Sequence, residues 1–254
     1  MPDGYLNDES ERLMQQTTEA DTEPSMRTLI LANNGTRAAW LQAGALGLLL
    51  SIWFLVIYSS GGHVPFALYH PLFISVGLFF LLQGLLVLQP TSTPSAKRVG
   101  LVAHQLLIFV LGLPLISIGV WIMWHAHSKP GAKHFISLHG ILGGVLFVLL
   151  WIQALFGLST VYSGGQLYGS MSRAKGLWKY HRCVEYVNTF SISGYAIAVL
   201  LASEIMLALW NTTWGQKVTS TPAAMLLSFV VFGVGYKVAR RVQVTKLGMT
   251  QAGP

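Results

Sequence analysis

Four histidines stand at similar places in four consecutive hydrophobic segments, each at or near the N-terminal end of its segment. These histidines are His70, His104, His139 and His181. An imidazole inside an apolar membrane segment is costly unless it has a ligand or a partner. Histidine also binds transition metals and transfers protons near neutral pH. The repeated placement therefore predicts a site in which paired imidazoles coordinate a metal or relay protons.

The composition indicates which class of protein holds these histidines. Hydrophobic residues form 53% of the 254 residues and charged residues only 10%, whereas soluble domains have about 25% charged residues. A bilayer core about 30 Å thick needs roughly 20 apolar residues per helix. We therefore predict an all-α integral membrane protein with six transmembrane helices, of which helices 2–5 form a four-helix core that carries the histidines. The six segments are 38–58, 68–88, 99–124, 135–160, 184–210 and 222–238.

The rest of the chain leaves little room for other chemistry. Residues 1–37 are polar and contain seven of the nine acidic residues, which predicts a disordered tail. A single domain over 38–240 and a C-terminal tail over 241–254 complete the predicted organisation. No GxGxxG motif follows a strand, so the sequence indicates no nicotinamide or flavin site. The single cysteine, Cys183, excludes an internal disulfide and a CxxC metal site.

The distribution of basic residues predicts the orientation in the membrane. With six spans, 13 of the 16 Lys and Arg residues lie on the side that holds both termini, and only Lys129, Lys133 and Lys217 lie on the other. Basic residues concentrate in cytoplasmic loops, so both termini are predicted to be cytoplasmic. The net charge of +7 is then explained by topology and lipid contact, with no nucleic-acid partner expected.

This topology sorts the histidines into two pairs at different depths. Helices 2 and 4 begin on the outer side, which puts His70 level with His139, and helices 3 and 5 begin on the cytoplasmic side, which puts His104 level with His181. A rise of about 1.5 Å per residue separates the two pairs by about 20 Å. Glycines on the ligand faces, among them Gly77, either leave clearance for a planar cofactor or allow close helix packing.

The ordered set of histidine motifs resembles the cytochrome b561 family over residues 38–240. The motifs are Tyr69-His70-Pro71-Leu72, Ala103-His104-Gln105, Ser137-Leu138-His139-Gly140 and Lys179-Tyr180-His181. The resemblance implies a six-helix transmembrane oxidoreductase, a homodimer with two haem b groups. It implies that His70 and His139 ligate the outer haem iron and that His104 and His181 ligate the cytoplasmic one. It also implies electron transfer from cytoplasmic ascorbate to monodehydroascorbate or a ferric chelate on the other side.

The resemblance also implies an ascorbate site made of basic residues on the cytoplasmic side. Lys97, seven residues before His104, matches one family lysine, whereas Leu101 stands where a second lysine is expected. Arg173 corresponds to the family arginine before the fifth helix. The predicted site consists of Lys97, Arg98, Arg173 and Lys175. Such a cationic rim would concentrate an anionic donor, although topology alone also explains these residues.

Two further groups of residues have alternative interpretations. His125 and His127 lie in the outer loop beside His134, where they either meet the electron acceptor or are solvated interfacial side chains. Glu185, one turn after His181, either orients that ligand or pairs with Arg182. The sequence suggests no role for Glu204, near the outer end of the fifth helix.

A six-helix transporter of protons or metal ions is the alternative function. Its intramembrane histidines would relay protons or bind the ion. The sequence shows no internal repeat with helices broken at the midplane, and the histidines lie toward the two membrane faces rather than at one central site. Both observations favour the oxidoreductase.

Overall fold

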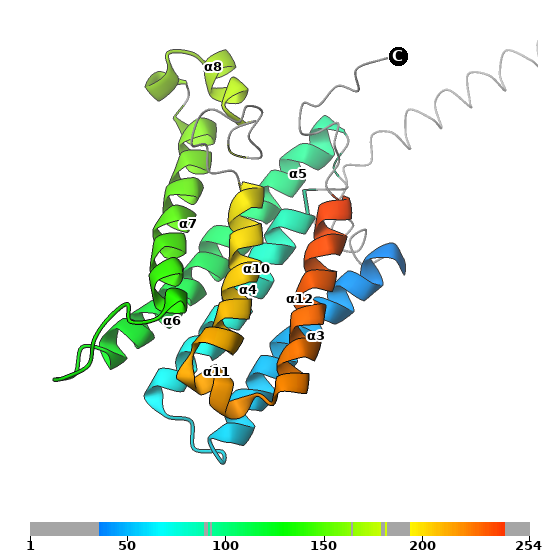
Figure 1. Cartoon of the computed structure of the whole chain (residues 1–254). Helices are drawn as coiled ribbons and strands as arrows, with labels where there is room; N and C mark the ends of the chain where they lie inside the picture. Colours follow the sequence, from blue (N-terminus) through cyan, green and yellow to red (C-terminus); the bar gives the residue numbers. More distant parts are fainter. Residues whose placement is uncertain are drawn as a thin grey trace, which may run out of the picture.

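The computed structural model describes residues 36–88, 91, 93–163, 165–178, 181 and 194–241. This part of the chain forms helices joined by turns and loops (Figure 1). The predicted tails, apart from their few residues next to the helices, lie outside it. The longer helices are α3 (Thr36–Ser59), α4 (Tyr69–Leu86), α5 (Pro94–Gln105), α6 (Leu113–Ala126), α7 (Leu138–Tyr162), α10 (Gly194–Asn211) and α12 (Thr221–Arg241). The shorter ones are η1 (Phe66–Leu68), η2 (Leu106–Gly112), η3 (Gln166–Tyr168), α8 (Met171–Gly176) and α11 (Thr213–Val218).

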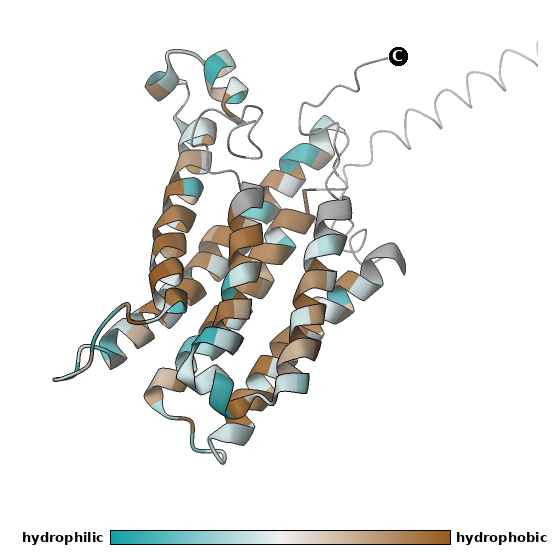
Figure 2. Cartoon of the chain, viewed as in Figure 1, coloured by the Kyte–Doolittle hydropathy of each residue, from teal (hydrophilic) through white to brown (hydrophobic). Residues whose placement is uncertain are grey.

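Four continuous helical stretches are long and apolar enough to cross a membrane, and two shorter apolar helices accompany them. The four are Trp40–Ser59, Phe66–Leu86, Pro94–Ala126 and Leu138–Tyr162, and the shorter two are Ile197–Asn211 and Thr221–Tyr236. The prediction of an all-helical membrane protein is thereby confirmed. Figure 2 shows hydrophobic residues along most of each long helix and hydrophilic residues gathered toward helix ends and loops.

The third span begins five residues earlier than the hydropathy predicted. Thr93 caps α5 by accepting a hydrogen bond from the backbone N–H of Ala96, and Pro94 occupies the first turn, where its missing N–H costs nothing. The helix therefore starts at Pro94, in a polar stretch that an apolar run cannot reveal. Lys97 and Arg98 are consequently helical rather than part of a loop.

A stretch of π-helix, η2, interrupts this same span between α5 and α6. It ends just before Pro114, which has no N–H to donate to the preceding turn. Wider π-helical turns are one way in which a helix accommodates such a defect, and they occur often at functional sites. His104 lies at the end of α5, two residues before η2 begins.

The longer helices pack against one another as a bundle. α4 packs against η2 and α6, α7 packs against α10 and α6, and α12 packs against α3 and α10. The core that joins α4, α6, α7 and α10 consists of Leu81, Leu113, Ile116, Leu150, Ala154 and Ile197. Because lipid tails are as apolar as these side chains, close packing rather than exclusion of water holds such helices together.

A pair of glutamines links α3 to α4 by two reciprocal hydrogen bonds. Gln42 Nε2 donates to Gln83 Oε1 over 3.0 Å, and Gln83 Nε2 donates to Gln42 Oε1 over 2.8 Å. Polar pairs between membrane helices contribute about 0.6–2 kcal/mol. We expect a double-mutant cycle of Gln42→Leu and Gln83→Leu, followed by unfolding in detergent, to give a coupling energy in that range. Additive effects of the two substitutions would contradict this prediction.

Candidate functional site

The structure places the four histidines in two facing pairs. His70 on α4 faces His139 in the first turn of α7, with 6.2 Å between ring centres and 81° between ring planes. His104 at the end of α5 faces His181, with 6.4 Å between ring centres and 89° between ring planes. These are the pairs expected from the alternating direction of the helices.

Backbone carbonyl groups fix the orientation of two of these rings. His70 Nδ1 lies 2.8 Å from the carbonyl oxygen of Gly119 on α6, and His104 Nδ1 lies 2.8 Å from that of Gly84 on α4. A carbonyl oxygen only accepts hydrogen bonds, so Nδ1 carries the proton in both rings. Each Nε2 therefore keeps its lone pair, which is the form that binds a metal.

Side chains from other helices contact the remaining two rings. His139 Nδ1 lies 2.7 Å from Oε1 of Glu204 on α10. His181 Nδ1 lies 3.0 Å from Nε2 of Gln153 on α7, and the same amide donates to the backbone carbonyl oxygen of His181. Each of the four imidazoles thus has a defined neighbour at Nδ1.

The two pairs lie at well-separated levels in the bundle. On α4, His70 belongs to one pair and Gly84, the partner of His104, marks the level of the other. On α7, His139 and Gln153 mark the same two levels. Both spacings are 14 residues, which corresponds to about 21 Å along a helix axis. The separation of about 20 Å expected from the sequence therefore agrees with the structure.

The glycines near the histidines make room for specific neighbours. A Cβ at Gly157 on α7 would lie 2.5 Å from Cε1 of the His181 ring, and one at Gly143 would lie 2.8 Å from Glu204 Oε1. A Cβ at Gly77 would meet Ile116, which belongs to α6. Close helix packing, rather than clearance for a planar cofactor, therefore accounts for Gly77. Gly143 leaves space for the Glu204 carboxylate beside His139.

The predicted basic residues gather at one end of the bundle. Lys97 and Arg98 lie on exposed positions early in α5, and Arg173 and Lys175 lie on exposed positions of α8. Figure 1 shows α8 and the start of α5 at the same end, opposite the loop that joins α6 to α7. His104 follows Lys97 by seven residues, about 10 Å along the helix. Glu185 and Arg182 lie outside the described residues.

The structure separates His125 from His127, the two histidines that the sequence grouped near the electron acceptor. His127 faces His134, with 6.0 Å between ring centres, and its Nδ1 lies 3.0 Å from the carbonyl oxygen of Met123. His125 instead stacks on Trp121, with ring centres 5.5 Å apart. Within the described residues there is no group of three or more potential metal ligands. The structure therefore pairs His127 with His134 rather than with His125.

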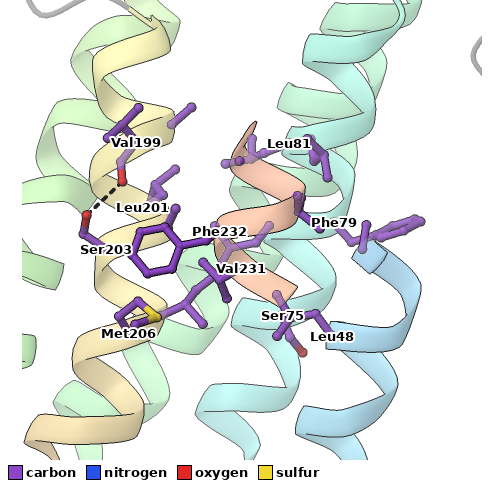
Figure 3. Close-up of a pocket in the computed structure, with 18 of the residues that line it drawn as sticks. Leu48, Ser75, Phe79, Leu81, Val199, Leu201, Ser203, Met206, Val231 and Phe232 are labelled. Carbon is purple, nitrogen blue, oxygen red and sulfur yellow. Dashed lines mark hydrogen bonds between the residues drawn. The ribbon is translucent and has the colours of Figure 1, made fainter. Parts of the chain in front are cut away.

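A separate cavity of about 680 Å³ lies between α3, α4, α10 and α12 (Figure 3). Apolar side chains form nearly all of its lining. The hydroxyls of Ser75 and Ser203, which also line it, donate to carbonyl oxygens of their own helices, Leu72 and Val199. None of the four histidines borders this cavity, so it lies apart from the candidate site.

The fold and the histidine pairs define a helical membrane protein that presents two bis-imidazole sites at two depths. Residues 69–207, which include all four histidines, match the family model described as eukaryotic cytochrome b561. This match covers more than half of the chain, and the protein belongs to the cytochrome b561 family. The resemblance found in the sequence is thereby confirmed. Membership of this family implies haem.

Three of the similar curated proteins have the name transmembrane ascorbate-dependent reductase CYB561. The chain is 35% identical over 105 residues to the one from Homo sapiens, 31% over 104 residues to that from Mus musculus, and 32% over 104 residues to that from Bos taurus. Each alignment covers 41% of this chain and 41% of the relative. The match thus spans about two fifths of the length of these relatives. No solved structure matches the chain significantly.

Sequence reasoning missed three groups that contact the histidines. Gln153 is a polar residue within an apolar helix, and this break in hydropathy could have marked it as a functional residue. The carbonyl groups of Gly84 and Gly119 have no equivalent pattern, because every residue carries a carbonyl. The sequence suggests no role for Glu204, because its contact with His139 depends on the packing of α7 against α10.

Proposed function

We propose that this protein is a transmembrane ascorbate-dependent oxidoreductase with two haem b groups. It moves electrons from cytoplasmic ascorbate to monodehydroascorbate or a ferric chelate on the other side. The observation that carries this proposal is the pair of facing-imidazole sites about 21 Å apart along the helices. The names of the relatives and the family membership support the same reaction.

The distances between the rings fit an iron atom between each pair. A metal–imidazole bond is about 2 Å long, and the ring centre lies about 1 Å behind the nitrogen, so two axial imidazoles have ring centres roughly 6 Å apart. The ring centres lie 6.2 Å and 6.4 Å apart in the structure. The residues present therefore fit two haem irons, one of which would be held by His70 and His139 and the other by His104 and His181.

Haem bound at such a site would supply single-electron exchange. The protein's own groups prepare the ligands for this role. The carbonyl groups of Gly119 and Gly84 hold His70 and His104 in the tautomer with a free Nε2. Gln153 Nε2 donates to the backbone carbonyl oxygen of His181 and thereby positions this residue, but an amide nitrogen beside Nδ1 does not select the tautomer with a free Nε2.

The basic end of the bundle would receive the donor. Lys97, Arg98, Arg173 and Lys175 lie there, on α5 and α8, at the end nearer to the His104–His181 pair. Ascorbate is an anion near neutral pH, so these cations would raise its local concentration. The acceptor would meet the opposite end, where His127 and His134 face each other. This assignment places both termini in the cytoplasm, as the distribution of basic residues predicts.

Neutralising the basic end should weaken the use of ascorbate. Exposed charge pairs contribute about 0.2–1 kcal/mol, so we expect Lys97→Ala and Arg173→Ala each to raise the KM for ascorbate by up to roughly fivefold. Haem content should stay unchanged, and the effect should shrink at high salt. Lys129→Ala and Lys133→Ala, at the opposite end, are the matched controls. If all four variants had the same KM for ascorbate, Lys97 and Arg173 would only help to set the orientation of the protein in the membrane.

The proposed function is tested by a visible spectrum of the purified protein before and after ascorbate is added. Haem is quantified in parallel as the pyridine hemochrome. We expect two haems per chain and sharp low-spin bands that appear with ascorbate. If the haems were reduced by dithionite but not by ascorbate, the physiological electron donor would have to be a different molecule. A protein that binds no haem when haem is supplied would overturn the proposal and favour the transporter.

A further inference from the structure

Glu204 is the one carboxylate side chain in the described part of the chain, and it contacts a proposed haem ligand. It lies on α10, and its side chain is only 12% exposed. Oε1 is 2.7 Å from His139 Nδ1. This contact has the distance of an ion pair but not the geometry of a hydrogen bond, and among the described residues neither oxygen of Glu204 nor His139 Nδ1 has a hydrogen-bond partner. The contact therefore joins two groups that depend on each other.

The surrounding residues are arranged to keep this carboxylate in place. A buried carboxylate in an apolar helix is costly unless it is paired. The space that it needs comes from Gly143, one turn after His139, where a Cβ would lie 2.8 Å from Glu204 Oε1. α7 and α10 pack directly against each other. The pairing thus depends on a glycine of one helix and an acid of the other.

The partner of His139 differs in charge from the partners of the other ligands. His70 and His104 donate from Nδ1 to neutral carbonyl oxygens, and Gln153, beside His181, is also neutral. A carboxylate beside Nδ1 of a ligating histidine favours the tautomer that carries its proton on Nδ1, and its negative charge makes the other ring nitrogen more basic. A more basic ligand beside a negative charge stabilises ferric iron relative to ferrous iron.

We propose that Glu204 is a positioning residue that holds His139 by the contact of its carboxylate with Nδ1 and lowers the reduction potential of the haem between His70 and His139. This inference rests on the proposed function, because it requires haem at that pair. Its consequence is an asymmetry between the two haems. The haem on the side of the acceptor becomes a stronger reductant than it would be without the carboxylate.

A redox titration of Glu204→Gln tests this proposal. Glutamine keeps the size of the side chain and a polar group beside Nδ1, but it removes the charge. We expect one of the two midpoint potentials to rise, with at least a tenfold larger ratio of reduced to oxidised haem at a fixed potential. For a one-electron couple this ratio corresponds to about 59 mV. The low-spin electron paramagnetic resonance signal of the same haem should shift as well.

Two further variants separate the carboxylate from general effects on the helix. Gly143→Ala places a methyl group against the carboxylate and should raise the same midpoint potential by a smaller amount. Ser203→Ala is the matched control, because Ser203 precedes Glu204 but faces the cavity in Figure 3 and donates to the Val199 carbonyl oxygen. It should move neither midpoint. The variant His139→Ala identifies which midpoint belongs to the pair.

The outcomes distinguish this inference from the proposed function. If Glu204→Gln and Gly143→Ala retain both haems with unchanged midpoints, the role of Glu204 is overturned while the diheme function stands. A shift confined to the haem between His104 and His181 overturns it too. If Glu204→Gln cannot be obtained with two haems, the titration of Gly143→Ala decides in the same way. A wild-type protein without haem at His139 overturns the proposed function itself.

Discussion

Replacing either member of a histidine pair with alanine should abolish one of the two low-spin haem signals and leave the other. We expect His139→Ala to affect one signal and His104→Ala to affect the other. The physical reason is that each iron depends on two facing imidazoles, whose ring centres lie 6.2 Å or 6.4 Å apart. Loss of one imidazole would leave the haem of that pair with only one histidine to hold it. Electron paramagnetic resonance together with pyridine hemochrome measures the change.

His125→Ala is the matched control for these substitutions. His125 stacks on Trp121 and meets Phe66 edge-on, outside both pairs, so both low-spin signals should persist in this variant. If His104→Ala and His139→Ala abolished the same signal, the two-site assignment would be wrong. Two intact signals in either variant would show that the iron has other ligands.

Gly157→Ala should remove the haem between His104 and His181 without changing a ligand. The new Cβ would lie 2.5 Å from Cε1 and 3.0 Å from both nitrogens of the His181 ring. Real side chains do not approach so closely, so the ring must leave its place beside His104. We expect haem content to fall from two per chain to one and ascorbate-dependent electron transfer across the membrane to be lost. Haem quantification and transfer assays in proteoliposomes measure both effects.

Gly47→Ala on α3 is the control for a glycine substitution within a membrane span, because no atom lies within 4 Å of a Cβ built there. This variant should retain both haems and its transfer rate. Retention of two haems and normal transfer by Gly157→Ala would show that His181 ligates iron from a different position. The result would then weaken the assignment of His181 but not that of His70 and His139.

Much of the candidate site follows from composition and from the direction of the helices. Apolar runs of about 20 residues can only be stable in a membrane as helices, which is why the segments predicted at 38–58 and 135–160 agree closely with α3 and α7. The polar start of α5 at Pro94 was missed, because a capping threonine and not an apolar residue begins that helix. The pairing of His70 with His139 required only that consecutive helices run in opposite directions.

The groups that hold the histidines come from residues far apart in the chain. Gly119 lies 49 positions after His70, and Gln153 lies 28 positions before His181. No periodicity relates such residues, because their contacts depend on how each helix is rotated against its neighbour. The same reason explains why His127 faces His134 while His125 stacks on Trp121. The rotation of α6 and the path of its loop decide this, not the order of the residues.

The amino-acid sequence by itself determined the membrane class, the helical segments and the two levels of paired histidines, because hydropathy and helix length depend only on composition and order. Only the tertiary structure decided what each imidazole contacts at Nδ1. The carboxylate of Glu204 reaches His139 because α10 packs against α7 and Gly143 leaves room between them. Such a contact depends on the relative rotation of two packed helices, which the pattern of either helix alone does not specify.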